Sequence, residues 1–175
     1  HGKGVAPEWR MISTLRQQLA DHGYTTLSIQ MPILAVDAQP EAYPPTYPEA
    51  VERLRIATNH LKGKGYRNIA IVSHSMGSRM SHAFMAQNPG DIKAWAALGL
   101  GGTETYAGIK APVLDLYGAH DLPVVLSTAK QRSASLKGNV SGKQVVVPDT
   151  DHFFAGKEDA MVKAVTDFLD GLGLK

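Results

Sequence analysis

The segment Ser73-His74-Ser75-Met76-Gly77 places a serine at the end of an apolar run and at the start of a helical one. A serine at such a place sits on a tight strand-to-helix turn, where its hydroxyl is lifted clear of the sheet and can act as a nucleophile. Ser73 and Gly77 are small, as the close approach of two backbones around a strained residue requires. Pentapeptides of this kind are common, and Ser75 would serve equally well as an ordinary helix N-cap. The two interpretations are balanced on this segment alone.

A serine nucleophile needs a histidine as its base and an acid that orients the histidine. Among the seven histidines, His152 stands in a loop after an apolar strand and before the last helix. Asp121 follows the preceding strand in the same way. Asp121 could instead be an ordinary helix N-cap. Asp151, which directly precedes His152, could be an ordinary surface charge. The order Ser75, Asp121, His152 at three suitable strand ends favours a catalytic triad over three unrelated roles.

The other candidates for base and acid fit less well. Predicted helix ends hold His22 and His60, on the side away from the carboxyl ends of the strands, and His82 lies within a helix. His74 adjoins the candidate nucleophile, but consecutive side chains on a sharp turn are expected to point apart. Asp115 lies inside a strand, where we expect it to be buried or to point away from the cleft.

Helical spacing of apolar residues alternates along the chain with short, near-continuous apolar runs. The predicted helices are residues 8–22, 49–61, 76–87, 124–136 and 157–172, and the predicted strands are residues 25–30, 68–73, 93–98, 112–117 and 144–147. Residues 31–48 contain five prolines and are expected to form a loop. Apolar strands without polar alternation are typical of a parallel sheet covered on both faces, so the predicted class is α/β, as a single domain. In such sheets ligands bind beyond the carboxyl ends of the strands, which is where the three candidate residues fall.

Composition excludes several other kinds of chemistry. The 175-residue chain is 43% hydrophobic and 19% charged, and it has no cysteine, so disulfides, thiolate metal sites and a cysteine nucleophile are excluded. Its 18 basic and 16 acidic residues are scattered, with a formal net charge of +2, which argues against binding to nucleic acid. No apolar run is long enough to span a membrane and no signal-peptide pattern is present, which leaves the compartment open.

The sequence resembles the α/β-hydrolase superfamily over nearly its whole length, through Ser-His-Ser-Met-Gly, Tyr-Gly-Ala-His-Asp and Asp-His-Phe-Phe. The resemblance implies a mostly parallel central sheet with helices on both faces. It also implies that Ser75, Asp121 and His152 form the family's triad, in the family's own chain order. Ser73 stands where the family usually has glycine, a mild departure that leaves the assignment in place.

The first residues of the chain and one short connection complete this resemblance. His1-Gly2-Lys3-Gly4 resembles the family's oxyanion loop, so the backbone N–H groups of Lys3 and Met76 would hold the oxyanion. Family members often insert a lid between two strands, but residues 99–111 are too short for a helical lid. We therefore expect no cap domain and an open cleft, as in small, capless bacterial hydrolases.

The implied function is hydrolysis of a carboxylic ester or thioester of a small molecule through an acyl-enzyme, with no metal and no organic cofactor. Two alternatives stay open: a catalytically silent α/β-hydrolase fold used for binding or as a scaffold, and a triad that performs acyl transfer or perhydrolysis. Tyr43 and Tyr47 wall the site or belong to a rigid surface loop, while Trp9 and Trp95 are expected to be core residues. The oligomeric state is not indicated.

Strand count raises a question about the amino-terminal side of the sheet. The five predicted strands correspond to the family's fourth to eighth, and the family places its third strand between the fourth and the fifth. Residues 25–30 could then not pair directly with residues 68–73. We therefore expect residues 1–175 to be a trimmed form that lacks its N-terminal strand or strands, or to form a sheet with a gap.

Overall fold

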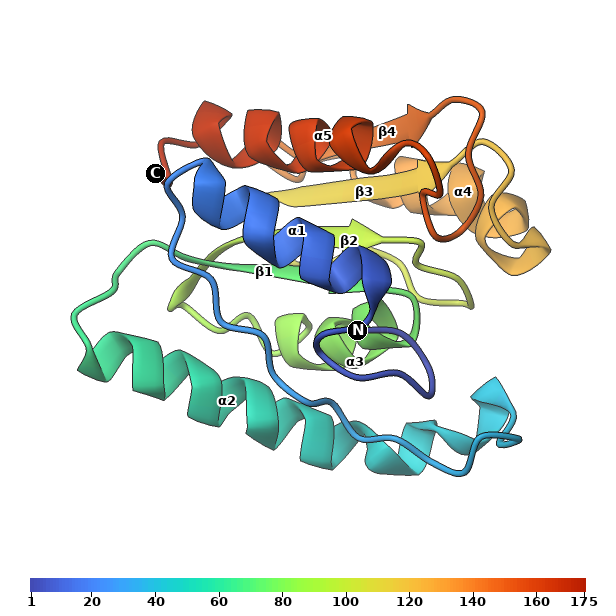
Figure 1. The fold of residues 1–175 in the computed structure, drawn as a ribbon, viewed down its shortest axis with the longest axis horizontal. Coiled ribbons are helices and arrows are strands. Elements are labelled where there is room, and N and C mark those ends of the chain that lie inside the picture. Colours follow the sequence, from blue (N-terminus) through green and yellow to red (C-terminus); the bar gives the residue numbers. More distant parts are fainter.

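A computed structural model describes all residues from 1 to 175 and contains one sheet of four parallel strands, in the order β1-β2-β3-β4 (Figure 1). The strands are β1 (Ile69–His74), β2 (Ile92–Leu98), β3 (Val113–Gly118) and β4 (Lys143–Val147). The α-helices are α1 (Arg10–Asp21), α2 (Tyr47–Gly63), α3 (Met76–Met85), α4 (Pro123–Ser135) and α5 (Glu158–Gly171). The α/β class is confirmed, and every predicted helix is present.

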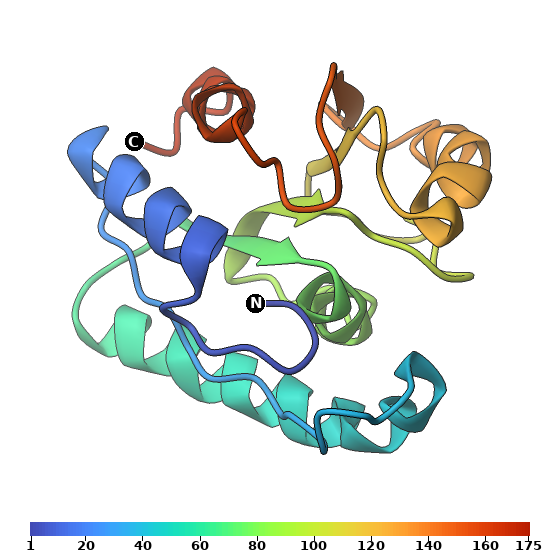
Figure 2. The same cartoon turned by 45° about the vertical axis from the view of Figure 1, so that its right-hand side comes forward.

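Helices cover both faces of the sheet, as Figures 1 and 2 show. One face carries α1 and α5, whose apolar stripes pack on Ala94, Ala96 and Leu98 of β2. The opposite face carries α2 and α3, which pack with Trp95 and Ala97 of the same strand. Side chains on a strand point alternately to the two faces, so β2, buried along nearly all its length, contributes to both cores.

Strand register brings the carboxyl ends of the strands to one edge of the sheet. His74 at the end of β1 is level with Leu98 of β2, and Leu98 is level with Leu116 of β3. Gly118 at the end of β3 is level with Val147 at the end of β4. The three connections that carry Ser75, Asp121 and His152 therefore leave the sheet at the same edge.

The loop predicted for residues 31–48 is confirmed, because the segment forms no strand and no α-helix before Tyr47. It contains only two short 3₁₀ helices, Pro40–Ala42 and Pro44–Thr46, before α2 begins at Tyr47. The connection between β2 and β3 contains no helix, so the fold has no cap domain at this position. No helix combines the length and the apolar character that crossing a bilayer would need.

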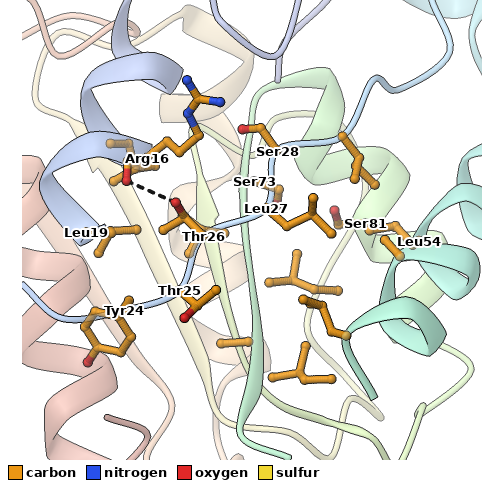
Figure 3. A pocket seen from close by; sticks show the side chains of 18 of the residues that line it. Arg16, Leu19, Tyr24, Thr25, Thr26, Leu27, Ser28, Leu54, Ser73 and Ser81 are labelled. Carbon is orange, nitrogen blue, oxygen red and sulfur yellow. Dashed lines mark hydrogen bonds between the residues drawn. The ribbon is translucent and has the colours of Figure 1, made fainter. Parts of the chain in front are cut away.

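The strand predicted for residues 25–30 is wrong, because these residues form no strand and the sheet has four strands rather than five. The segment passes along the outer edge of β1, but a cavity of about 230 Å³ lies between them, lined by residues 25–29 and 69–73 (Figure 3). Thr26 instead donates a hydrogen bond to the carbonyl of Arg16 in α1. A β-prone run becomes a strand only where another strand pairs with it, and here none is within reach.

Candidate active site

Ser75 lies on the turn between β1 and α3 in a strained backbone conformation. Its φ is +57°, a region that non-glycine residues rarely adopt. Its backbone N–H donates to the carbonyl of Leu98 at 2.8 Å, which fixes the turn to the neighbouring strand. Ser75 holds the N-cap position of α3 without making a side-chain cap bond, so the ordinary N-cap role does not explain this serine.

His152 and Asp121 come from separate loops and meet Ser75 at the sheet edge. The Nε2 atom of His152 lies 2.8 Å from Ser75 Oγ, and its Nδ1 lies 2.6 Å from Asp121 Oδ1. Because a carboxylate only accepts, Nδ1 carries the proton, and Nε2 is left to accept from the serine hydroxyl. Both His152 and Asp121 are buried, with 4% of each residue exposed. The arrangement is a continuous hydrogen-bonded chain that ends at a partly exposed hydroxyl.

The loops that carry Asp121 and His152 are tied to the sheet and to each other. Asp121 accepts from the backbone N–H groups of Leu122 at 2.7 Å and Gly118 at 3.3 Å, which leaves its carboxylate no freedom to rotate. The N–H of His120 donates to the carbonyl of Thr150, which links the aspartate turn to the histidine loop. Asp121 is therefore not the N-cap of α4, a position held by Leu122 without a side-chain cap bond.

Gly99, the first residue after β2, allows the imidazole of His152 to lie against the backbone. Its φ is +57°, and a Cβ at this position would lie 2.7 Å from His152 Cε1. Any larger residue here would be strained and would collide with the ring. Sequence reasoning missed this role, because a glycine after a strand is also an ordinary turn signal.

The amino-terminal loop lies beside Ser75. A Cβ at Gly2 would lie 3.3 Å from the Cβ and 3.7 Å from the Oγ of Ser75, so this loop passes directly against the candidate nucleophile. Lys3 follows, and its ammonium group donates to the carbonyl of Ala38 at 2.8 Å. Met76 is the first residue of α3, so its backbone N–H has no acceptor within the helix.

The aromatic residues divide between core and site. Tyr43 and Trp95 are completely buried, and Tyr43 thus belongs to the core rather than to a surface loop. Tyr47 is partly buried, and its hydroxyl lies 3.8 Å from the sulfur of Met76, next to the candidate nucleophile. Trp9 precedes α1 and packs edge-on against Phe153 at 5.3 Å between ring centroids. Of the two tyrosines, only Tyr47 borders the site.

The remaining candidates lie away from the serine. Asp115 is buried in β3, as expected, and accepts hydrogen bonds from Arg132, Tyr106 and Gln144. Burial raises the pKa of Asp115, while the Arg132 guanidinium opposes that shift. His82 lies 2.7 Å from the carbonyl of Thr105 through Nε2. No group of three or more His, Cys, Asp or Glu side chains is arranged to hold a metal ion.

His74 contradicts the expectation that it would point away from the site. Its Nε2 donates to the carbonyl oxygen of His152 at 2.9 Å, and the two imidazole rings lie 4.6 Å apart. It therefore contacts the residue that Ser75 also contacts, but through the main chain. The geometry of a single turn did not reveal this contact, because it depends on how the His152 loop folds back onto the end of β1.

No protein-family model matches the sequence, and no curated protein is similar to it in sequence. Several solved structures are similar in fold. A dienelactone hydrolase from Anabaena variabilis superposes with a TM-score of 0.80 at 20% identity, over 98% of this chain and 83% of that one. An α/β serine hydrolase without a lid, from Xanthomonas campestris, gives a TM-score of 0.69 at 15% identity, over 95% and 75% of the two chains.

A third similar structure is a protein described as a predicted CIB-like hydrolase from Thermoplasma acidophilum. Its TM-score is 0.57 at 22% identity, over 70% of this chain and 59% of that one, so residues 1–175 span less than two thirds of its length. At these identities the likeness concerns the fold. The chain has the α/β-hydrolase fold, in a form without a cap domain.

Proposed function

We propose that the chain is a serine hydrolase that cleaves a carboxylic ester or thioester of a small molecule through a Ser75–His152–Asp121 triad. The observation that carries the proposal is the unbroken hydrogen-bonded chain from Ser75 Oγ through both nitrogens of His152 to Asp121 Oδ1, at 2.8 and 2.6 Å. This is the relation between nucleophile, base and orienting acid that acyl transfer requires. The hydrolases and esterases among proteins of similar fold support the same reaction class.

The proposed reaction assigns each step to a residue of the triad. Ser75 Oγ attacks the carbonyl carbon while His152 Nε2 takes the hydroxyl proton. The Asp121 carboxylate, held by two backbone N–H groups, keeps the imidazole in its Nδ1–H form and stabilises the imidazolium. His152 then returns the proton to the leaving alcohol or thiol, and an acyl-enzyme remains. Water, deprotonated by the same nitrogen, attacks the acyl group and releases the acid and free Ser75.

The negative charge that develops on the carbonyl oxygen needs donors close to Ser75. The N–H of Met76 lies at the amino-terminal end of α3, where the helix dipole favours an anion. The backbone N–H of Lys3 is the proposed second donor, in the loop whose Gly2 lies against Ser75. One such donor contributes about 3 kcal/mol to transition-state stabilisation. No step requires a metal or an organic cofactor.

The surroundings of the triad indicate what kind of ester would fit. Leu122 and Phe153, which directly follow Asp121 and His152, are large apolar side chains with 45% and 46% of their surfaces exposed. The connection between β2 and β3 provides no lid over them. An exposed apolar surface next to the triad, with the Phe153 ring 5.2 Å from that of His152, suits a substrate with an apolar group.

Labelling with a fluorophosphonate and turnover of short p-nitrophenyl esters test the proposal. We expect Ser75→Ala to abolish both, because no other hydroxyl is bonded to His152. The control is Ser81→Ala, which removes a buried hydroxyl from the same helix and should leave both intact. Labelling of Ser75→Ala at the rate of the unmodified chain would refute the nucleophile assignment.

Further measurements separate the proposal from its alternatives. A properly folded chain that neither reacts with fluorophosphonate nor turns over any member of an ester and thioester panel would be a binding or scaffold protein. Product analysis in the presence of an added alcohol or of hydrogen peroxide separates hydrolysis from acyl transfer and perhydrolysis. We expect the free acid to be the main product, because the uncovered site admits water.

A further inference from the structure

His74 is a buried histidine beside the triad that the proposed reaction does not use. Only 1% of the residue is exposed, and its ring lies against that of His152 at 4.6 Å between centroids, inclined by 42°. Its Nε2 lies 2.9 Å from the backbone carbonyl oxygen of His152. Since a carbonyl only accepts, this nitrogen must carry the proton.

The surroundings of Nδ1, the second ring nitrogen of His74, favour a neutral imidazole. Nδ1 is buried and has no hydrogen-bond partner, and a Cβ at Gly2 would lie 3.4 Å from it. Protonation would place a charged N–H where no acceptor exists, next to His152. Burial therefore lowers the pKa of His74 to about 3, and His152 and the α-amino group of His1 act in the same direction. Asp121 and the hydrogen bond to the His152 carbonyl oppose the shift, but His74 stays neutral at any pH at which the enzyme would work.

The main chain of His152 needs such a contact because its loop makes sharp turns. Asp149 and Phe154, on either side of His152, both have positive φ values, of 52° and 55°. Asp151 accepts from the N–H groups of Phe153 and Ala155, which orders the loop from within. The bond from His74 joins the carbonyl group of His152 directly to the end of β1.

The end of β1 thus holds His152 at two points. Ser75 contacts the imidazole at Nε2, and His74, one residue earlier, contacts the carbonyl of the same histidine. A rotation of the His152 peptide would carry the imidazole away from both Ser75 Oγ and Asp121 Oδ1. Displacements of about 1 Å between reacting groups can reduce a rate by about a hundredfold.

We propose that His74 is a positioning residue, which holds the His152 imidazole in line with Ser75 by donating its Nε2–H to the main-chain carbonyl of His152. The inference rests on the proposed function, because it assigns His74 a part in that reaction. His74 itself touches neither the substrate nor the transferred proton. Its neutral ring also ensures that the imidazolium formed at His152 faces no second positive charge at 4.6 Å.

A matched pair of variants isolates the hydrogen bond. Glutamine in His74→Gln carries an N–H donor the same number of bonds from Cα as histidine Nε2, and methionine in His74→Met has a similar shape without a donor. We expect His74→Gln to retain most of the activity. His74→Met should lower kcat by about tenfold to a hundredfold with little change in KM, because the substrate contacts are unaffected.

Proton NMR compares the same two variants without a need for substrate. The proton shared by His152 Nδ1 and Asp121 resonates at low field in proton NMR when the imidazole is firmly held. We expect the signal in the unmodified chain and in His74→Gln, and its loss or broadening in His74→Met. Equal rates and equal spectra for the two variants would overturn the proposal.

Failure of the inference can be told apart from failure of the proposed function. If esters are not turned over but the NMR contrast persists, His74 positions His152 and the hydrolase assignment is wrong. If Ser75→Ala abolishes activity but the two His74 variants behave alike, only the positioning role is wrong. Should His74→Met not fold, ¹⁵N spectra of the unmodified chain decide: a proton on Nε2 of His74 supports the proposal, and the opposite tautomer, with Nε2 unprotonated, overturns it.

Discussion

β3 and the turn that follows it contain two buried aspartates, which bond to different kinds of partner. Asp121, beyond the end of the strand, bonds to a histidine that reaches a partly exposed hydroxyl. Asp115, within the strand, bonds to Arg132, Tyr106 and Gln144, all inside the fold. The exposed fractions of the two residues are nearly equal, at 4% and 0%. Burial and hydrogen bonding alone therefore do not distinguish the proposed catalytic acid, Asp121, from a structural aspartate.

The partner of each aspartate makes the distinction. Arginine side chains stay protonated in proteins. The Nε–H of Arg132 is shared between the two carboxylate oxygens of Asp115, at 3.1 and 3.0 Å, so this pair cannot pass a proton on. His152 can exchange a proton at Nε2 while Nδ1 stays bonded to Asp121. We therefore expect substitutions at Asp121 to affect rate, and substitutions around Asp115 to affect stability.

The largest expected effect is that of Asp121→Asn on catalysis. An asparagine amide can face His152 Nδ1 with a donor, which would favour the wrong imidazole tautomer and remove the charge that stabilises the imidazolium. We expect kcat for a p-nitrophenyl ester to fall by about ten-thousandfold. Steady-state kinetics measures the change, and the melting temperature should stay near that of the unmodified chain. A loss of activity explained by unfolding would mean that both aspartates are structural.

Asp115→Asn should show the reverse pattern. The change leaves the guanidinium of Arg132 buried without a charged partner, and Arg132 has only 1% of its side chain exposed. We expect the free energy of unfolding to fall by about 3 kcal/mol. Urea denaturation measures this loss, and kcat per folded molecule should be unchanged. A large decrease in kcat for a folded Asp115→Asn protein would contradict the division between the two aspartates.

Much of this division could be predicted from the sequence. The position of Asp121 after a strand and of Asp115 inside one separated the two residues, because side chains of a parallel sheet reach a cleft only beyond the carboxyl ends of its strands. The same rule placed Ser75 and His152 at one edge before any contact was known. Which partners Asp115 would find was not predictable, since Tyr106, Arg132 and Gln144 come from three distant segments.

The failures of sequence reasoning share one physical cause. Residues 25–30 have β propensity but no neighbour to pair with, and the contact made by His74 depends on a loop folding back from far along the chain. Local patterns do not contain such long-range relations.

The cavity beside β1 lies where a further strand was expected, so that expectation stays a prediction. His1 lines that cavity, and we propose that a strand joined to its amino-terminal side fills it. A chain extended in that direction should slow hydrogen exchange in β1, whereas unchanged exchange would refute the idea.

The acid sensitivity of the fold should originate at the site rather than at Asp115. The pKa of His74 falls from an ordinary 6.5 to about 3 on folding, so below pH 6.5 the unfolded chain takes up a proton that the folded chain refuses. Stability is fully present above pH 6.5 and decreases toward pH 3. Between pH 6.5 and pH 5 the loss from this group is about 2 kcal/mol. The raised pKa of Asp115 acts in the opposite direction, because there the folded state binds the proton more tightly.

Urea denaturation of the unmodified chain and of His74→Gln at both pH values isolates this contribution. The two proteins differ only at residue 74, so the difference between their pH profiles belongs to His74 and its neighbours: His152, Asp121 and the α-amino group of His1. Between pH 6.5 and pH 5 we expect the free energy of unfolding of the variant to fall by about 2 kcal/mol less than that of the unmodified chain. Parallel pH profiles would show that His74 is protonated as easily in the folded state as in the unfolded one.

The smallest expected effect is that of Tyr106→Phe, which removes one bond from the Asp115 cluster and keeps the aromatic packing. The Tyr106 hydroxyl donates to Asp115 Oδ1 at 2.8 Å, while the ring packs edge-on against Trp95 at 5.6 Å. The other donors to the carboxylate remain, so we expect the free energy of unfolding to fall by about 1 kcal/mol. Activity should not change, because no bond connects this cluster to His152. A measurable decrease in kcat for Tyr106→Phe would show that the two aspartates are coupled through β3, and that the strand transmits changes in the core to the triad.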